Sequence, residues 1–441
     1  MTRGIGRSGA SAAGTDAARA AIAHRAAAAA GDKAGKQRLT ASFALYNYRL
    51  FFTGALISNI GTWMARVAQD WLVLTQLTNR SSSALGLVTG LQFLPVALLA
   101  PYGGAIADRF SKRSILMITQ AALGLNAAVL WALVATGEAR LWHVYVLAVL
   151  QGIATAFDNP SRQAFVSEMV PAKLIPNAVG LNSASFNGAR LLGPGVAGLI
   201  IGAWGIAPAL LINAISFAAV IADLWLMRTS ELTPGPIRRG KGAVREGVAY
   251  VRKRSDIILV LVIVFMLGTF GMNFQITNAL MATRVYGKGA EEYGLLGSIM
   301  AIGTLGAALM AARRGRPKLR TMLGALAGFA VSTTALALAP TYTVFAILLV
   351  PTGLFALTVM TTANSSVQLA AAPEVRGRVM ALYMAIFMGG TPLGAPFVGW
   401  IGDVLGPRWT ILVGSIATGA TFLAVAAYLL WRRPVMLDDR V

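Results

Sequence analysis

Ionisable side chains lie inside long apolar stretches of this chain, where a charge is costly unless it is paired or wet. Arg66 and Asp70 stand four residues apart, with Gln69 between them. Asp158 and Arg162 repeat this spacing further along. Residues four apart share one face of a helix, so each pair can neutralise itself. The same groups could instead line a cavity and move protons, because burial and neighbouring charges change how readily an acid holds a proton.

A further arginine, Arg190, lies near the middle of another apolar stretch, too far from either end for its side chain to reach water. It therefore needs an acidic partner or a wet cavity, and Asp70 and Asp158 are the available acids. For all these groups a structural role and a proton-coupling role stay open. The candidates for proton coupling are Arg66, Gln69, Asp70, Asp158, Arg162 and Arg190.

The composition is that of a membrane protein that crosses the bilayer many times. Of its 441 residues 56% are hydrophobic and only 12% are charged. The absence of cysteine excludes disulfides and thiolate chemistry. Of the two histidines, His24 lies in the tail and His143 at the outer end of an expected helix. No phosphate-binding loop for a nucleotide is present. We therefore expect no enzyme, no metal site and no cofactor, only an ion gradient as a source of energy.

Stretches of about 20 apolar residues predict an all-α fold with twelve transmembrane helices in two pseudo-symmetric bundles of six. The expected helices are 47–78, 83–107, 113–135, 142–168, 176–203, 206–228, 257–283, 292–312, 319–340, 343–370, 376–402 and 408–431. The expected organisation is a basic, disordered tail over 1–42, a bundle over 43–228, a linker with a short interfacial helix over 229–255, a bundle over 256–431 and a tail over 432–441.

The distribution of the basic residues indicates how the chain is oriented in the membrane. On this map, 31 of the 38 Lys and Arg lie on the side of the termini, five lie on the other side and two lie within spans. The positive-inside rule then places both termini in the cytoplasm. The net charge of +21 is therefore explained by topology, and we expect no nucleic-acid partner.

The two halves resemble each other. A shift of about 200 residues brings Gly188 onto Gly390 and Pro194 onto Pro396, so the expected fifth and eleventh helices share glycine and proline placement. A six-plus-six duplication is expected of transporters whose site lies between parallel repeats.

A charged turn joins the second and third helices. Gly104, Asp108, Arg109, Lys112 and Arg113 follow the spacing Gly-x-x-x-Asp-Arg-x-x-Lys-Arg. This pattern resembles motif A of the major facilitator superfamily. In that superfamily the aspartate faces the start of the eleventh helix, which here carries Arg376, so the resemblance implies an inner gate that holds the outward-open state. The corresponding turn of the second half, 306–316, has no acid, so the gate is expected from one half only.

A second motif lies on the fifth helix. Arg190, Gly193, Pro194 and Gly198 resemble motif C, which marks exporters that exchange drugs for protons. The sequence departs from the family at Ala148, where motif B carries an arginine tied to proton transfer. Arg190 and Arg162 are the candidates to replace it.

The nearest resemblance is to the exporter branch that contains the enterobactin exporter and the macrolide efflux proteins, over roughly residues 43–431. It rests on the runs 158–164, 192–194, 376–379 and 390–394. It implies a bacterial inner-membrane transporter, working as a monomer among membrane lipids, that exports a drug, macrolide or siderophore-like molecule in exchange for protons by alternating access. The alternatives are a nutrient importer or uniporter, and a lipid or lysolipid translocase of the same fold.

Polar side chains within the spans are candidates for the substrate cavity, because a buried amide must find partners. A purely structural role, as bridges between helices, stays open for these amides. Next to two of these amides, Met272 and Phe274 could form an adaptable apolar wall. The cavity candidates are Gln92, Asn182, Asn213, Asn273, Gln275, Asn278, Asn364, Gln368 and Tyr383.

Overall fold

The computed structural model describes residues 40–233, 243–314, 317–372 and 375–431. Within these ranges the regular structure is entirely helical. Most of the expected tails and the middle of the expected linker lie outside the described residues. The part of the linker that is described contains α8 (Ala243–Val251), where a short helix was expected, and its place at a membrane interface stays a prediction.

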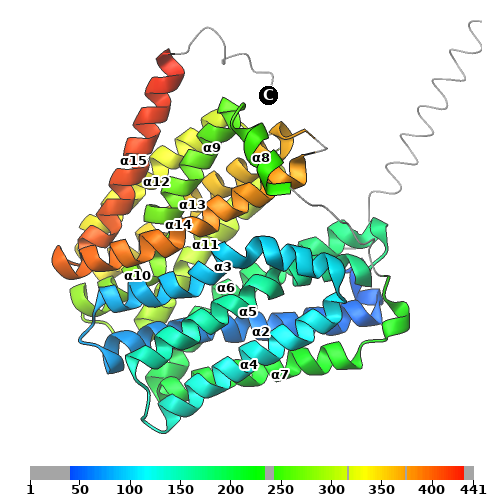
Figure 1. Ribbon diagram of the computed structural model, residues 1–441. Helices are drawn as coiled ribbons and strands as arrows, with labels where there is room; N and C mark the ends of the chain where they lie inside the picture. Colours follow the sequence, from blue (N-terminus) through cyan, green and yellow to red (C-terminus); the bar gives the residue numbers. More distant parts are fainter. Residues whose placement is uncertain (1–39, 234–242, 315–316, 373–374, 432–441) are drawn as a thin grey trace, which may run out of the picture.

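Two groups of long helices lie side by side in Figure 1. The first group is α2 (Tyr46–Leu72), α3 (Ser82–Arg109), α4 (Lys112–Ala135), α5 (Leu141–Met169), α6 (Ile175–Trp204) and α7 (Ile206–Leu226). The second group is α9 (Ser255–Met266) with α10 (Phe274–Leu280), then α11 (Ala290–Arg313), α12 (Leu319–Leu338), α13 (Tyr342–Ala370), α14 (Arg376–Val404) and α15 (Pro407–Trp431).

Ten of the described helices are long and apolar enough to cross a membrane. The long helices α2 and α6 are not among the ten, because α2 carries Arg49, Arg66 and Asp70 and α6 is rich in glycine, asparagine and serine. A polar face on these two helices fits a place beside a cavity rather than against lipid. The expectation of twelve spans therefore stays a prediction.

The stretch expected as one helix over 257–283 is interrupted. The π-helical turn η5 (Leu267–Gly271) separates α9 from α10, and a second one, η6 (Met281–Val285), follows α10. Asn273 turns its amide back to donate a 2.8 Å hydrogen bond to the carbonyl of Thr269. Gly394 of α14 packs against the same carbonyl. The interruption thus follows from local hydrogen bonding and close packing at the interface between helices.

Two pairs of helices join the halves, α3 with α14 and α6 with α11. Glycine makes both contacts possible. A Cβ atom on Gly399 would lie 3.2 Å from the Cα of Gly86, and one on Gly294 would lie 3.0 Å from the Cα of Gly198. Backbones approach this closely only where no side chain intervenes. We call the end of the bundles at which α2 begins the terminal end, and the end at which α3 begins the distal end.

Candidate functional site

A cavity of about 630 Å³ lies between the halves. Its lining follows α2 from Phe51, about one turn after that helix begins, to Arg66, and it includes Phe387 and Thr391 of α14. Most of the lining comes from the first half. The size falls within the range of about 300–1,000 Å³ that is usual for sites of small molecules.

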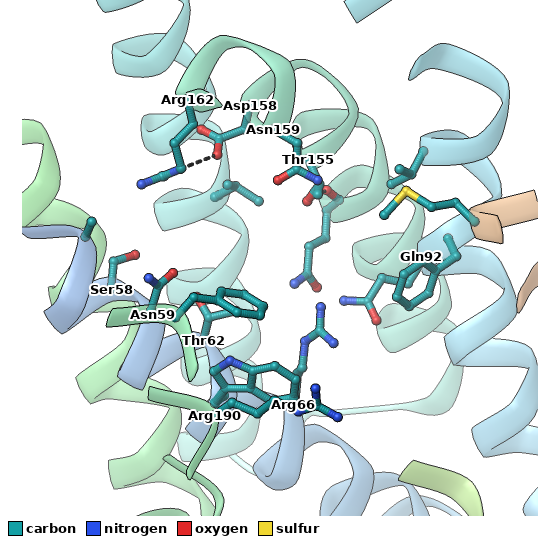
Figure 2. Close-up of a pocket in the computed structure, with 18 of the residues that line it drawn as sticks. Ser58, Asn59, Thr62, Arg66, Gln92, Thr155, Asp158, Asn159, Arg162 and Arg190 are labelled. Carbon is teal, nitrogen blue, oxygen red and sulfur yellow. Dashed lines mark hydrogen bonds and ion pairs between the residues drawn. The ribbon is translucent and has the colours of Figure 1, made fainter. Parts of the chain in front are cut away.

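The two arginines expected in mid-span meet in this cavity (Figure 2). The guanidinium carbon of Arg66 lies 5.0 Å from the ring centre of Trp63, and that of Arg190 lies 5.6 Å from the same ring. Arg66 also lies 5.9 Å from the ring of Phe93. The Nε atom of Arg66 is buried and makes no hydrogen bond. Neither arginine takes part in an ion pair within the described part of the chain.

Asp158 is buried in the cavity wall, where three donors bind its carboxylate. Oδ1 accepts hydrogen bonds of 2.8 Å from the hydroxyl of Thr119 and 2.7 Å from the amide of Gln120. Oδ2 accepts one of 3.0 Å from Nε of Arg162, which is the expected pair on α5 (Figure 2). The two α4 donors were not expected from the sequence, because nothing in the spacing of one helix reveals its neighbour.

Asp70 does not pair with Arg66, although the spacing allowed it. Among the described residues its carboxylate instead accepts a 2.9 Å hydrogen bond from the hydroxyl of Tyr293, on α11 of the other half. Asp70 is 4% exposed and Tyr293 is 5% exposed, so this bond lies in the closed interface between the halves. Trp71 stacks on the same tyrosine ring. Gln69 faces a small neighbouring pocket that it shares with Arg66 and Asn213.

The residues predicted for the substrate cavity fall into two groups, those that line the cavity and those that do not. Gln92, Asn182, Asn273 and Gln275 line the cavity, as do Met272 and Phe274. Asn278, Asn364, Gln368 and Tyr383 are not part of its lining in this conformation, so their role in a substrate cavity stays a prediction. Tyr383 is buried against the carbonyl of Met360, and Gln368 points to the exposed surface of its helix. From the second half the lining comes from residues 272–276, directly after η5, and from Phe387, Met388 and Thr391 of α14.

Sequence reasoning missed a set of polar side chains that line the cavity from α2 and α5. Their spacing carries a signal, because residues three, four or seven apart share the helix face that bears Arg66 or Arg162. The missed residues are Ser58, Asn59, Thr62, Gln151, Thr155, Asn159 and Gln163.

The motif A residues lie at the terminal end. Two of the basic ones, Lys112 and Arg113, bind partners within the first half. Lys112 forms a 2.8 Å ion pair with Glu168 of α5. Arg113 donates to the carbonyl of Leu224 on α7 at 2.7 Å. These contacts fix the start of α4 between its neighbours.

The expected gate is not formed in this conformation. Asp108 and Arg376 are both exposed, and they form no ion pair in the part of the chain that is described. Arg109 is also exposed, and a Cβ atom on Gly104 would touch nothing, so it is the preceding Gly103 that packs closely, against Ala156. The gate was expected for the opposite conformation, so it stays a prediction.

At the distal end the halves are closed by Asp403, at the end of α14. Its carboxylate accepts hydrogen bonds of 2.9 Å from the backbone amides of Ser82 and Ser83, and others from the hydroxyls of Ser81 and Ser82. It thus caps the first turn of α3, where the helix dipole favours an anion. Arg284 of η6 forms a 2.9 Å ion pair with the same carboxylate and also donates to the carbonyl of Arg80. Sequence reasoning missed this cluster, which joins residues about 320 positions apart.

The motif C residues lie at the second contact between the halves. The carbonyl of Pro194 and the backbone of Gly198 pack against Gly294 of α11, and Gly193 packs on Trp63 of α2. The backbone amide of Gly195 donates a 3.1 Å hydrogen bond to the hydroxyl of Ser298 on α11. The motif therefore forms part of the distal closure.

The paired bundles, the interface closed at one end and the polar cavity define a membrane transporter of the major facilitator type. A bacterial homologue of the human lysosomal transporter Spinster, in an inward-facing and unoccupied conformation, superposes with a TM-score of 0.71 at 16% identity, covering 90% of this chain and 99% of that one. The nucleoside transporter NupG superposes with a TM-score of 0.64 at 12% identity, covering 86% of this chain and 98% of that one. At these identities the likeness shows the fold.

Residues 39–439 match the family described as transmembrane secretion effector, and the chain belongs to this family of transporters. The chain is 26% identical to the staphyloferrin A transporter of Staphylococcus aureus, over 84% of this chain and 93% of that protein. It is also 26% identical to the multidrug efflux pump Tap of Mycolicibacterium fortuitum, over 83% of this chain and 92% of that protein. The macrolide efflux protein A of Streptococcus pyogenes is 25% identical over 49% of this chain and 55% of that protein.

Proposed function

We propose that this chain exports a small amphipathic molecule across the bacterial cytoplasmic membrane in exchange for protons, by alternating access. The observation that carries the proposal is a cavity of small-molecule size between two halves that are closed at the distal end. With the termini in the cytoplasm, as the distribution of basic residues predicts, this conformation loads substrate from inside the cell. Relatives named for siderophore, multidrug and macrolide transport support export over import.

We assign the proton to Asp70. Its carboxylate has one hydrogen-bond donor, Tyr293, and that donor belongs to the other half. Separation of the halves at the distal end breaks this bond and opens Asp70 to the outer solution. Asp158 is a weaker candidate, because a proton there must displace one of the three donors that already occupy its oxygens.

Transport is tested with the purified chain in liposomes and an imposed pH gradient. The probes are a macrolide, a cationic dye and a carboxylate siderophore, each trapped or offered on one side, together with a pH-sensitive dye for the proton. The expected result is movement of at least one probe against its gradient, with protons moving the opposite way. Movement that ignores the pH gradient contradicts the antiport.

The two alternatives give different results in the same vesicles. An importer or uniporter moves its substrate in the same direction as the proton or without it. A lipid translocase moves a labelled lipid between the leaflets, which chemical quenching of the outer leaflet detects. Chain-free liposomes are the control for both measurements.

A further inference from the structure

The lining of the cavity carries more positive charge than negative charge. Its ionisable lining consists of three arginines and one aspartate. Arg162 and Asp158 bind each other at 3.0 Å. Arg66 and Arg190 remain, and they lie close enough for each charge to act on the other.

Among the described residues neither nearby acid forms an ion pair with these two arginines, although Asp70 lies close enough for its charge to act on Arg66. Asp70, one helical turn from Arg66, accepts its hydrogen bond from Tyr293. Asp158 is bound by Thr119, Gln120 and Arg162. Two guanidinium groups of like charge inside the membrane, with no more than the one carboxylate of Asp70 acting on them from outside the cavity lining, are costly. Such a cost is offset when a ligand brings the missing negative charge.

The side chains around the two arginines indicate the chemistry of the rest of that ligand. Both guanidinium groups lie against the ring of Trp63, which leaves their N–H edges available for an anion. Amides of Gln92 (Figure 2) and Asn182 line the same cavity, and they can donate further hydrogen bonds. The same wall also carries apolar side chains, and Phe186 of α6 packs edge to face on Trp63.

We propose that Arg66 and Arg190 form an anion-binding subsite, so that the transported molecule is an amphipathic acid with a carboxylate or phosphate at one end and an apolar body at the other. This inference rests on the proposed function in taking the cavity as the substrate site. Planar guanidinium groups bind such oxyanions through paired hydrogen bonds. A cationic drug meets repulsion at the same place.

Binding is measured with three fluorescent probes that share one apolar body, namely 1-pyrenebutyrate, 1-pyrenebutanamide and 1-pyrenebutylamine. The full chain is used in nanodiscs of zwitterionic lipid. The acid is expected to bind about tenfold or more tightly than the amide, because a hydrogen bond to a charged group contributes about that much to affinity. The amine is expected to bind most weakly. Equal binding of acid and amide overturns the proposal.

Substitution assigns the preference to the two arginines. Arg66→Gln and Arg190→Gln are each expected to lose about tenfold in affinity for the acid while keeping that for the amide. Unchanged amide binding shows that the variants are folded, and Arg66→Lys and Arg190→Lys recover part of the loss. Arg320→Gln removes the same charge from an exposed site and is the matched control. Acid binding that survives both glutamine changes contradicts the subsite.

Competition separates a free organic acid from a lipid headgroup. Displacement of bound pyrenebutyrate by benzoate identifies a soluble acid, and displacement by dihexanoylphosphatidylglycerol identifies a lipid-like anion. Displacement by either supports the subsite, and displacement by neither contradicts it. Because these measurements need no transport, arginine-dependent binding without export refutes only the proposed function. Export of neutral or cationic probes without any preference for the acid refutes only the subsite.

Discussion

At the scale of single residues, the two acids inside the first bundle have different partners: Asp158 binds Arg162 on its own helix, and Asp70 binds Tyr293 of the other half. Spacing four apart correctly predicted the contact between Asp158 and Arg162, since a helix fixes that geometry. The same spacing was wrong for Arg66 and Asp70, because Tyr293 binds Asp70 from a position 223 residues away. No local pattern encodes a contact of that range. The lack of an ion pair at Arg66 and Arg190 among the described residues is likewise visible only once the acids are placed.

Asp70→Asn tests the proton assignment at this scale. The amide fits in the same space but cannot take up and release a proton, so pH-driven transport is expected to fall by about two orders of magnitude or more, in line with the loss of a general acid or base. Downhill exchange of substrate is expected to continue. The measurement is uptake by liposomes with and without a pH gradient, and Asp158→Asn is the comparison.

Two outcomes would decide between the acids. Full pH-driven transport by Asp70→Asn would remove Asp70 from the mechanism. Loss of that transport in Asp158→Asn alone would instead assign the proton to Asp158, which pairs with Arg162 on α5.

At the scale of elements, helix positions were predicted closely and helix interruptions were not. The stretch expected over 142–168 is α5 at Leu141–Met169, because a long apolar run with polar ends has few alternatives. The stretch expected over 257–283 is interrupted by η5 and η6. Apolar composition is the same in an α-helical and a π-helical turn. The break follows instead from the packing of α14 on Thr269, a contact between distant segments.

Gly294→Ala tests the contact of α6 with α11. The new methyl group would meet the carbonyl of Pro194 and the backbone of Gly198, so closing the distal end costs about 1–3 kcal/mol of overpacking. Alanine favours the helix itself, so a loss cannot come from helix propensity. We expect the fraction of molecules that are closed at the distal end to fall. Distances between spin labels placed at that end measure this fraction.

Gly324→Ala is the matched control for this change. Gly324 lies within α12, and a Cβ atom there would touch nothing. A shift in both variants, or in neither, would show that the α6 and α11 contact does not set the balance.

At the scale of the whole molecule, different contacts close the two ends of the bundles. The distal end is closed by Asp403 of the second half, which caps α3 of the first. The gate expected at the terminal end uses Asp108 of the first half against the start of α14. Each half thus contributes an acid at the opposite end of the same helix pair, α3 and α14. The sequence revealed Asp108 through a local motif, whereas Asp403 gains its role only from the fold.

Asp403→Asn and Asp108→Asn should therefore shift the conformational balance in opposite directions. Because the chain has no cysteine, spin labels on Glu138→Cys and Pro340→Cys, both exposed near the distal end, report alone on its opening. Loss of a carboxylate at a helix start is worth about 1–2 kcal/mol, or a five- to thirtyfold change in population. Asp403→Asn is expected to lengthen the distance between the labels, and Asp108→Asn to shorten its average. Shifts of the same sign in both variants would contradict the two-latch mechanism, and Arg320→Gln should leave the distances unchanged.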